Sequence, residues 1–107
     1  MSRATASSDV FQAIADPTRR ALLDRLRQGE QSVKQLALPF EMSLAAISQH
    51  LSVLCEAGLV QQRRAGRQRF YRLNPNPLKE VSDWINHYEQ FWQEKLNALD
   101  EYLEEGS

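Results

Sequence analysis

The sequence predicts a mainly α-helical domain with one small β-hairpin. Apolar residues recur at helical spacing through most of the chain, which indicates several short helices. An Arg-rich segment with two aromatic residues surrounds a possible turn within residues 60–73, and residues 77–104 form one long amphipathic stretch. A chain of 107 residues, 42% hydrophobic and 25% charged, has room for one core. We therefore expect a flexible segment over residues 1–8 and a single domain over residues 9–107.

Two aspartates are predicted to start the first two helices. Asp9 can cap a short helix, and Asp16 can cap a second helix that has Pro17 at its first position. We expect the second helix to end at Gly29. The predicted inward-facing residues of the two helices are Val10, Phe11, Ile14, Ala21, Leu22, Leu23 and Leu26.

Two serines are predicted to start the next pair of helices. Ser32 and Gln35 have the Ser-x-x-Gln spacing of a capping box, which opens a short helix that Pro39 ends. Ser43 is a good N-cap for the helix predicted over residues 44–57. Two short helices joined by a tight turn form the helix-turn-helix pattern.

The helix over residues 44–57 has an unusual outer face. Leu44, Ile47, Leu51 and Leu54 recur at steps of three and four, and we expect them to face the core. The predicted outward residues are Ala45, Ala46, Gln49, Ser52 and Val53. These residues are small or uncharged, which suits close approach to another molecular surface. Our hypothesis is that this recognition helix enters a DNA major groove.

The segment over residues 60–73 is predicted to be a two-stranded hairpin. Phe70 and Tyr71 favour a strand, and Gly66 permits the turn. The hairpin carries five arginines and no acidic residue, as expected of a wing that lies along a sugar-phosphate backbone. The alternative is a solvated basic hairpin without a partner. The arginines are Arg63, Arg64, Arg67, Arg69 and Arg72.

The charge of the chain is divided between its two parts. Residues 1–73 hold eleven Lys and Arg against six Asp and Glu, a net charge of +5. Residues 74–107 hold two against eight, a net charge of -6. A basic body beside an acidic segment is expected if one face meets phosphate and the other does not.

The long helix predicted over residues 77–104 carries more apolar surface than one small domain can cover. Its apolar residues are spaced three or four apart, nearly as in a heptad repeat. We therefore expect a homodimer joined by the terminal helices. The alternative is that this helix packs across its own domain. The predicted dimer interface comprises Phe11, Ile14, Trp84, Tyr88, Phe91, Trp92, Leu96 and Leu99.

Several function classes are excluded by what the sequence lacks. No apolar run approaches the roughly 18 residues of a membrane span, and the N-terminus lacks the apolar core of a signal peptide, so we expect a cytoplasmic protein with no membrane partner. One cysteine cannot form an internal disulfide. There is no Gly-rich phosphate loop and no nucleophile with a base at a recognisable spacing. We therefore expect neither an enzyme nor a bound cofactor.

Four ordered motifs, which span most of the chain, carry a family resemblance. They are Ala15-Asp16-Pro17-Thr18-Arg19-Arg20-Ala21-Leu22-Leu23, Ile47-Ser48-Gln49-His50-Leu51, Ala57-Gly58-Leu59-Val60 and Arg63-Arg64-x-Gly66-Arg67-x-x-x-Tyr71-x-Leu73. The chain resembles the ArsR-type (ArsR/SmtB-like) winged-helix transcriptional repressors. The resemblance implies a winged helix-turn-helix dimer that binds an inverted-repeat operator in double-stranded DNA and represses its own gene or an adjacent operon.

The resemblance also assigns candidate DNA-binding residues. Gln49 is the candidate base reader, because its amide can pair bidentately with adenine. Ser48 and His50 lie nearer the helix flanks, and a half-buried structural role is an equal interpretation of His50. Arg63 and Arg64 point to opposite faces of the hairpin, so only one of them should reach DNA. The assigned set is Ser43, Ala46, Ser48, Gln49, His50, Arg64, Arg67 and Arg69.

Arg19 and Arg20, near the start of the second helix, are additional candidates for contact with the DNA backbone. A solvated helix face is an equal interpretation of these two arginines.

Many members of the resembled family respond to metals, but we expect no metal site in this chain. The third helix carries no Cys-x-Cys, since residues 32–37 contain no cysteine. Asp83 and His87 are i, i+4 neighbours and remain an alternative ligand pair across a dimer axis. Cys55 is expected to act as a small hydrophobe, with a redox switch as the alternative. The sequence therefore resembles a branch that senses no metal, and its inducer is unknown.

A winged helix used only for protein contacts remains an alternative of another class. Its expected signature is an apolar, Arg-poor wing, which this chain lacks.

Overall fold

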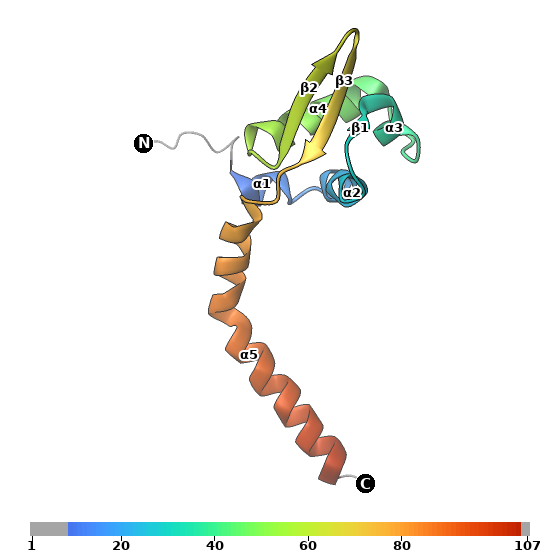
Figure 1. Cartoon of the computed structure of the whole chain (residues 1–107). Helices are drawn as coiled ribbons and strands as arrows, with labels where there is room; N and C mark the ends of the chain where they lie inside the picture. The colour runs from blue at the N-terminus through green and yellow to red at the C-terminus, as the bar shows by residue number, and fades with distance from the viewer. Residues whose placement is uncertain (1–8, 106–107) are drawn as a thin grey trace.

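The computed structural model describes residues 9–105, so the flexible segment predicted over residues 1–8 lies outside the described residues. The fold is mainly α-helical with one small sheet, as predicted (Figure 1). The elements in chain order are α1 (Val10–Ala13), α2 (Pro17–Leu26), β1 (Gln31–Ser32), α3 (Val33–Ala37), α4 (Leu44–Glu56), β2 (Val60–Ala65), β3 (Gln68–Leu73) and α5 (Leu78–Glu105).

All four predicted N-caps are confirmed. The carboxylates of Asp9 and Asp16 accept hydrogen bonds from backbone N–H groups two and three residues further on, at 2.8 and 3.0 Å. Ser32 and Gln35 form the complete capping box at the start of α3. The Ser43 hydroxyl accepts a 3.0 Å hydrogen bond from a backbone N–H of the first turn of α4. Each helix therefore begins where its sequence supplies an acceptor for the free N–H groups.

The observed C-terminal end of helix α2 differs slightly from the predicted one, whereas that of α4 agrees closely with the prediction. Helix α2 ends at Leu26, before the predicted Gly29, because the chain tightens into hydrogen bonds of i to i−3 type. At the end of α4, Gly58 adopts a φ of 79°. The N–H of Leu59 bonds to the carbonyl of Leu54 at 3.0 Å, which forms a Schellman motif. This reversal buries Leu59 and leads directly into β2.

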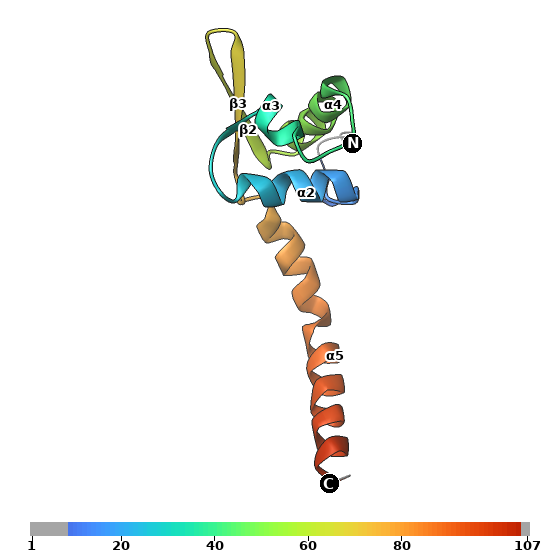
Figure 2. The same cartoon turned by 90° about the vertical axis from the view of Figure 1, so that its right-hand side faces the viewer.

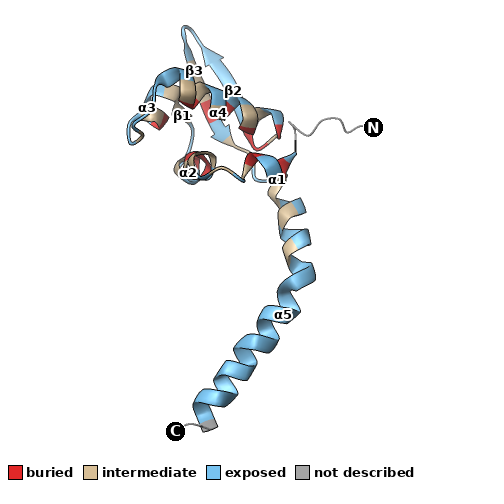
Figure 3. Cartoon of the chain, turned by 180° about the vertical axis from the view of Figure 1, so that it is seen from behind, coloured by how far each residue is buried: buried red, intermediate tan, exposed pale blue. Residues whose placement is uncertain are grey.

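The core lies between α1, α2, α3, α4 and the sheet, and buried residues are confined to this body (Figure 3). Two predictions for α4 are wrong. Leu44 is 47% exposed, because the inner face of α4 is covered only from Ile47 onward. Val53, predicted to face outward, packs against the core, since α4 contacts α1, α2, α3 and β2 and so buries a wider sector. The fully buried large side chains are Leu22, Leu26, Leu36, Ile47, Leu51, Leu54 and Leu59.

The sheet has three strands, whereas the sequence predicts two. Strand β1 pairs antiparallel with β3, Gln31 opposite Tyr71, and the strand order is β1-β3-β2. A strand of two residues is too short to show an alternating pattern, which is why it escapes prediction. Strands β2 and β3 form the predicted hairpin, with Ala65 opposite Gln68 and a two-residue turn at Gly66, whose φ is 65°.

Helix α5 projects away from the body along most of its length (Figures 1 and 2). The radius of gyration is 18.5 Å, whereas a compact chain of this length has about 13 Å. Near its start the helix packs on α1, where the rings of Phe11 and Trp84 meet edge to face at 5.6 Å. Among residues 9–105, no helix is both long and apolar enough to cross a membrane.

Candidate nucleic-acid interface

The outer face of α4 is uncharged up to the last residue of the helix. Ala45, Gln49 and Ser52 are exposed, and Ala46 and Ser48 are partly buried. No hydrogen bond joins the Gln49 side chain to another group in residues 9–105, so its amide is available both to donate and to accept. A free amide on a face of small residues can approach the edge of a base pair closely.

His50 lies half-buried behind this face, with 20% of its side chain exposed. Its Nδ1 lies 3.3 Å from Nη1 of Arg19 and 3.9 Å from Oδ2 of Asp16. Burial opposes the ionisation of Asp16, but the hydrogen bond from the Arg19 backbone and the nearby positive charges lower the pKa of Asp16 below its ordinary value. The structure thus favours the structural interpretation of His50.

The side chains of Arg19 and Arg20 turn back toward the end of α1. The guanidinium of Arg19 donates to the carbonyls of Ala13 at 2.7 Å and Gln12 at 3.0 Å. Arg20 donates to the carbonyl of Ile14 at 2.9 Å. Both side chains therefore satisfy carbonyl groups at the end of α1, a role that sequence patterns do not indicate.

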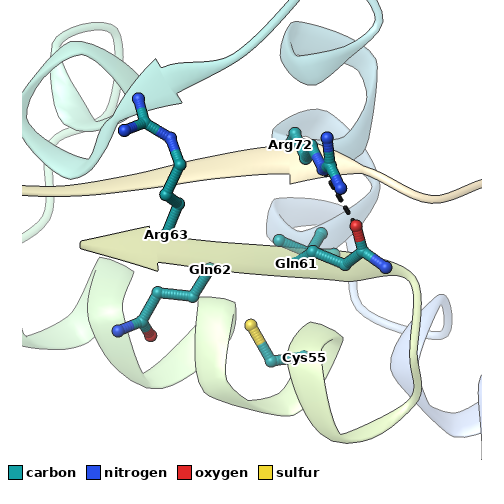
Figure 4. A pocket seen from close by; sticks show the side chains of 6 residues that line it. Cys55, Gln61, Gln62, Arg63 and Arg72 are labelled. Atoms are coloured by element: carbon teal, nitrogen blue, oxygen red, sulfur yellow. Dashed lines mark hydrogen bonds between the residues drawn. The ribbon is translucent and has the colours of Figure 1, made fainter. Parts of the chain in front are cut away.

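The two faces of the hairpin carry arginines with different surroundings. Arg63 forms a bidentate ion pair with Glu30, at 2.7 and 3.1 Å, and its guanidinium lies 4.9 Å from the centre of the Phe70 ring. The hydrogen bond from Arg63 lowers the pKa of the Glu30 carboxyl. On the same face, Arg72 donates to Gln61 at 2.9 Å (Figure 4). No sequence pattern indicates this role of Glu30, because it lies 33 residues from Arg63 along the chain.

The opposite face of the hairpin carries Arg64 and Arg69, which lie directly opposite each other on β2 and β3. Because side chains alternate along a strand, these two arginines share the face of Tyr71, which is buried against the body of the protein. Two like charges opposite each other are unfavourable without an anion nearby. Arg67 is exposed at the hairpin turn. The structure thus confirms that Arg63 and Arg64 point to opposite faces.

Cys55 lines a surface hollow of about 680 Å³ beside β2, to which residues of α4, β2 and β3 contribute (Figure 4). The side chain packs against the core, and burial raises the pKa of its thiol. A protonated thiol is a poor nucleophile, which favours the role of a small hydrophobe over a redox switch. Within residues 9–105, no group of three or more His, Cys, Asp and Glu side chains is arranged to hold a metal ion.

The predicted dimer residues fall into two sets. Phe11 and Ile14 are partly buried against the core of their own chain. The others lie along α5 and are about half exposed, with aromatic ring contacts running from Trp84 through Tyr88 to Phe91. This exposed set, which we call the α5 apolar face, consists of Trp84, Tyr88, Phe91, Trp92, Leu96 and Leu99.

Comparison with known proteins agrees with this geometry. Residues 16–62 match the family model described as "Bacterial regulatory protein, arsR family". The chain is 36% identical over 81 residues to the transcriptional repressor SdpR of Bacillus subtilis (strain 168), which covers 76% of this chain and 90% of that protein. The chain belongs to the ArsR family. It is therefore a DNA-binding transcriptional regulator with a winged helix-turn-helix fold, and it is not an enzyme.

Other ArsR-family similarities extend over most of the chain. It is 38% identical over 94 residues to the HTH-type transcriptional regulator Rv2034 of Mycobacterium tuberculosis, covering 88% of this chain and 85% of that protein. A crystal structure titled as a possible transcriptional regulator for arsenical resistance superposes with a TM-score of 0.69 at 46% identity. The superposition covers 85% of this chain and 92% of the other. The winged helix described above is thus the fold of its family.

Proposed function

We propose that this ArsR-family regulator is a homodimeric repressor, acting in the cytoplasm, that binds an inverted-repeat operator in its own promoter or that of an adjacent operon. The proposed mode of DNA binding rests on one observation, which is where Gln49 and the Arg64–Arg69 pair lie in the fold. The free amide lies on the uncharged face of α4, and the two arginines lie on the hairpin face that turns toward the body. One element can read bases while the other binds phosphate.

The proposed division of labour follows from the chemistry of each group. Gln49 reads an adenine, and the small residues around it let the helix enter the groove. The hairpin arginines supply most of the affinity through phosphate contacts and counterion release. Because His50 is half-buried, we propose that it supports the helix and touches DNA at most by its exposed edge. The proposed contact residues are Ser43, Ala46, Ser48, Gln49, His50, Arg64, Arg67 and Arg69.

The α5 apolar face supports the dimer. Six large apolar side chains on one projecting helix remain about half exposed, and soluble monomers rarely display such a contiguous patch. A second copy of the helix would cover them and hold two α4 helices at a defined distance, as an inverted repeat requires. Helix α5, which carries the acidic residues of the C-terminal segment, projects from the body on the side away from the basic hairpin (Figure 1), which keeps most of these carboxylates away from phosphate.

The decisive experiment is selection of genomic fragments by the full-length protein, followed by footprinting. The expected result is one protected inverted repeat near the gene itself or its neighbour. Absence of any selected fragment, or a protected site without two-fold symmetry, would contradict the proposal.

Release from DNA is proposed to be independent of a thiolate metal site, because Cys55 is the only cysteine and lies beneath β2 rather than on α3. Metal analysis of the purified protein, with operator affinity measured with and without chelator, tests this. A stoichiometric metal that changes the affinity would show the proposal to be wrong.

A further inference from the structure

One guanidinium group joins three helices in this structure. Arg19, on α2, donates through Nε to the carbonyl of Ala13 at 2.7 Å and through Nη2 to the carbonyl of Gln12 at 3.0 Å, both at the end of α1. Its remaining terminal nitrogen, Nη1, lies 3.3 Å from Nδ1 of His50 on α4. The side chain therefore reaches from the end of α1 to the recognition helix.

The contact determines how the His50 ring is held. A guanidinium only donates hydrogen bonds, so a neutral His50 accepts at Nδ1 and carries its proton on Nε2. Asp16, the N-cap of α2, lies 3.9 Å from the same Nδ1 and accepts from the backbone N–H of Arg19 at 3.0 Å. His50 directly follows Gln49, so the ring that Arg19 orients belongs to the turn of α4 that carries the base reader.

The other end of the connection lies next to the proposed dimer helix. Helix α1 has only four residues, and Phe11 on it packs edge to face on Trp84 of α5 at 5.6 Å. Arg19 holds the last carbonyls of that same short helix. A continuous series of contacts thus runs from α5 through α1 and Arg19 to His50.

We propose that Arg19 is a positioning residue that sets the orientation of α4 relative to the α1–α5 pair. The inference rests on the proposed function, since orientation matters most when two α4 helices must meet two half-sites at once. A small rotation of α4 about its contact with α1 changes the distance between the two Gln49 side chains in the dimer. Arg19 therefore determines which half-site spacing the protein prefers, without touching DNA.

Arg20 provides a matched control on the same helix. It also donates to a carbonyl at the end of α1, that of Ile14 at 2.9 Å, but within residues 9–105 no hydrogen bond or ion pair joins its side chain to α4. Substitution by lysine keeps the charge but loses the planar fork that spans several acceptors. R19K and R20K thus both lose hydrogen bonds to carbonyl groups at the end of α1, whereas only R19K also loses the contact with His50 on α4.

The experiment measures affinity for the selected operator and for operators with one base pair added or removed between the half-sites. We expect R19K to lose about 10-fold in affinity at the natural spacing and to discriminate less between spacings, with non-specific binding unchanged. We expect R20K to lose less than about 3-fold and to keep the wild-type spacing preference. Equal losses in both variants, or an unchanged spacing preference in R19K, would overturn the inference.

A second variant separates positioning from folding. H50L removes the acceptor for Arg19 but leaves the α1 carbonyls satisfied, so it must also flatten the spacing preference even if R19K does not fold. In the double variant R19K/H50L the fold-losses in affinity must be less than multiplicative, because both substitutions remove the same contact between Arg19 and His50. Losses that multiply independently would overturn the inference.

The proposed function and the inference about Arg19 fail in different ways. If the wild-type protein binds no inverted repeat, the proposed function fails and the inference fails with it. If the wild-type protein binds an inverted repeat and R19K keeps the wild-type spacing preference, only the inference about Arg19 fails.

Discussion

The recognition helix α4 and the terminal helix α5 both expose uncharged surface, but they differ in how they are supported. Helix α4 buries Ile47, Leu51 and Leu54 completely, and four other elements contact it. Helix α5 is packed only near its start, and its two tryptophans remain 50% and 52% exposed. Helix α4 is therefore positioned within one chain, whereas the apolar face of α5 is left uncovered by its own chain, and we propose that a second copy covers it.

The largest expected effect comes from disrupting the α5 apolar face. Trp92→Asp places a charge in the middle of the α5 apolar face, which a dimer would have to bury. We expect dissociation to monomers and a loss of operator affinity of at least about 100-fold. Sedimentation and operator binding measure the two effects, with Gln93→Asp, its exposed neighbour, as the control. A variant that stays dimeric, or a monomeric wild type, would refute the proposed role of α5.

The second-largest expected effect concerns α4, the helix that is packed within its own chain. Gln49→Ala should cost about 1 to 3 kcal/mol in discrimination at one base step while the fold and the dimer remain intact. Binding to a panel of single-base operator variants measures this loss. Gln28→Ala, an exposed amide in the loop after α2, should leave the whole panel unchanged. Uniform weakening at every base would instead mean that Gln49 contacts the backbone.

A smaller effect distinguishes the two faces of the hairpin. Arg64→Gln should weaken binding and reduce the slope of log affinity against log salt by about 1, because one phosphate contact is lost. Arg63→Gln should leave the slope unchanged, since Arg63 is paired with Glu30. The comparison is made by titration at several salt concentrations. Equal slopes for the two variants would show that the ion pair does not keep Arg63 from DNA.

The smallest effect concerns the Glu30–Arg63 pair itself. Because the pKa of Glu30 is lowered in the folded protein, its contribution to stability is present above its unfolded pKa and is lost as the pH falls through the folded value. Glu30→Gln should therefore lose less stability than the wild type on acidification from about pH 6 to about pH 3. Both groups are solvent-exposed, so the difference should be small. Thermal unfolding at each pH measures it, and identical acid sensitivity would contradict the pairing.

Local features of the fold were predictable because their causes lie close together in the chain. Asp9, Asp16, Ser32 and Ser43 cap helices through hydrogen bonds to N–H groups two or three residues away. Gly58 ends α4 through contacts within the same turn. The family motifs and the segregated charge likewise indicate a DNA-binding regulator, since both can be read from the order of residues alone.

The sequence by itself determined where the helices begin, the hairpin turn and the apolar face of α5. It determined the outer face of α4 only in part, since Val53 packs against the core and Leu44 is exposed. Only the tertiary structure decided what each arginine does. Arg19 meets His50 across 31 positions and Arg63 meets Glu30 across 33, so no local pattern could distinguish these two paired arginines from Arg64. The physical reason is that an arginine's role depends on which acceptor the folded chain brings within reach, and that acceptor lies far away in the sequence.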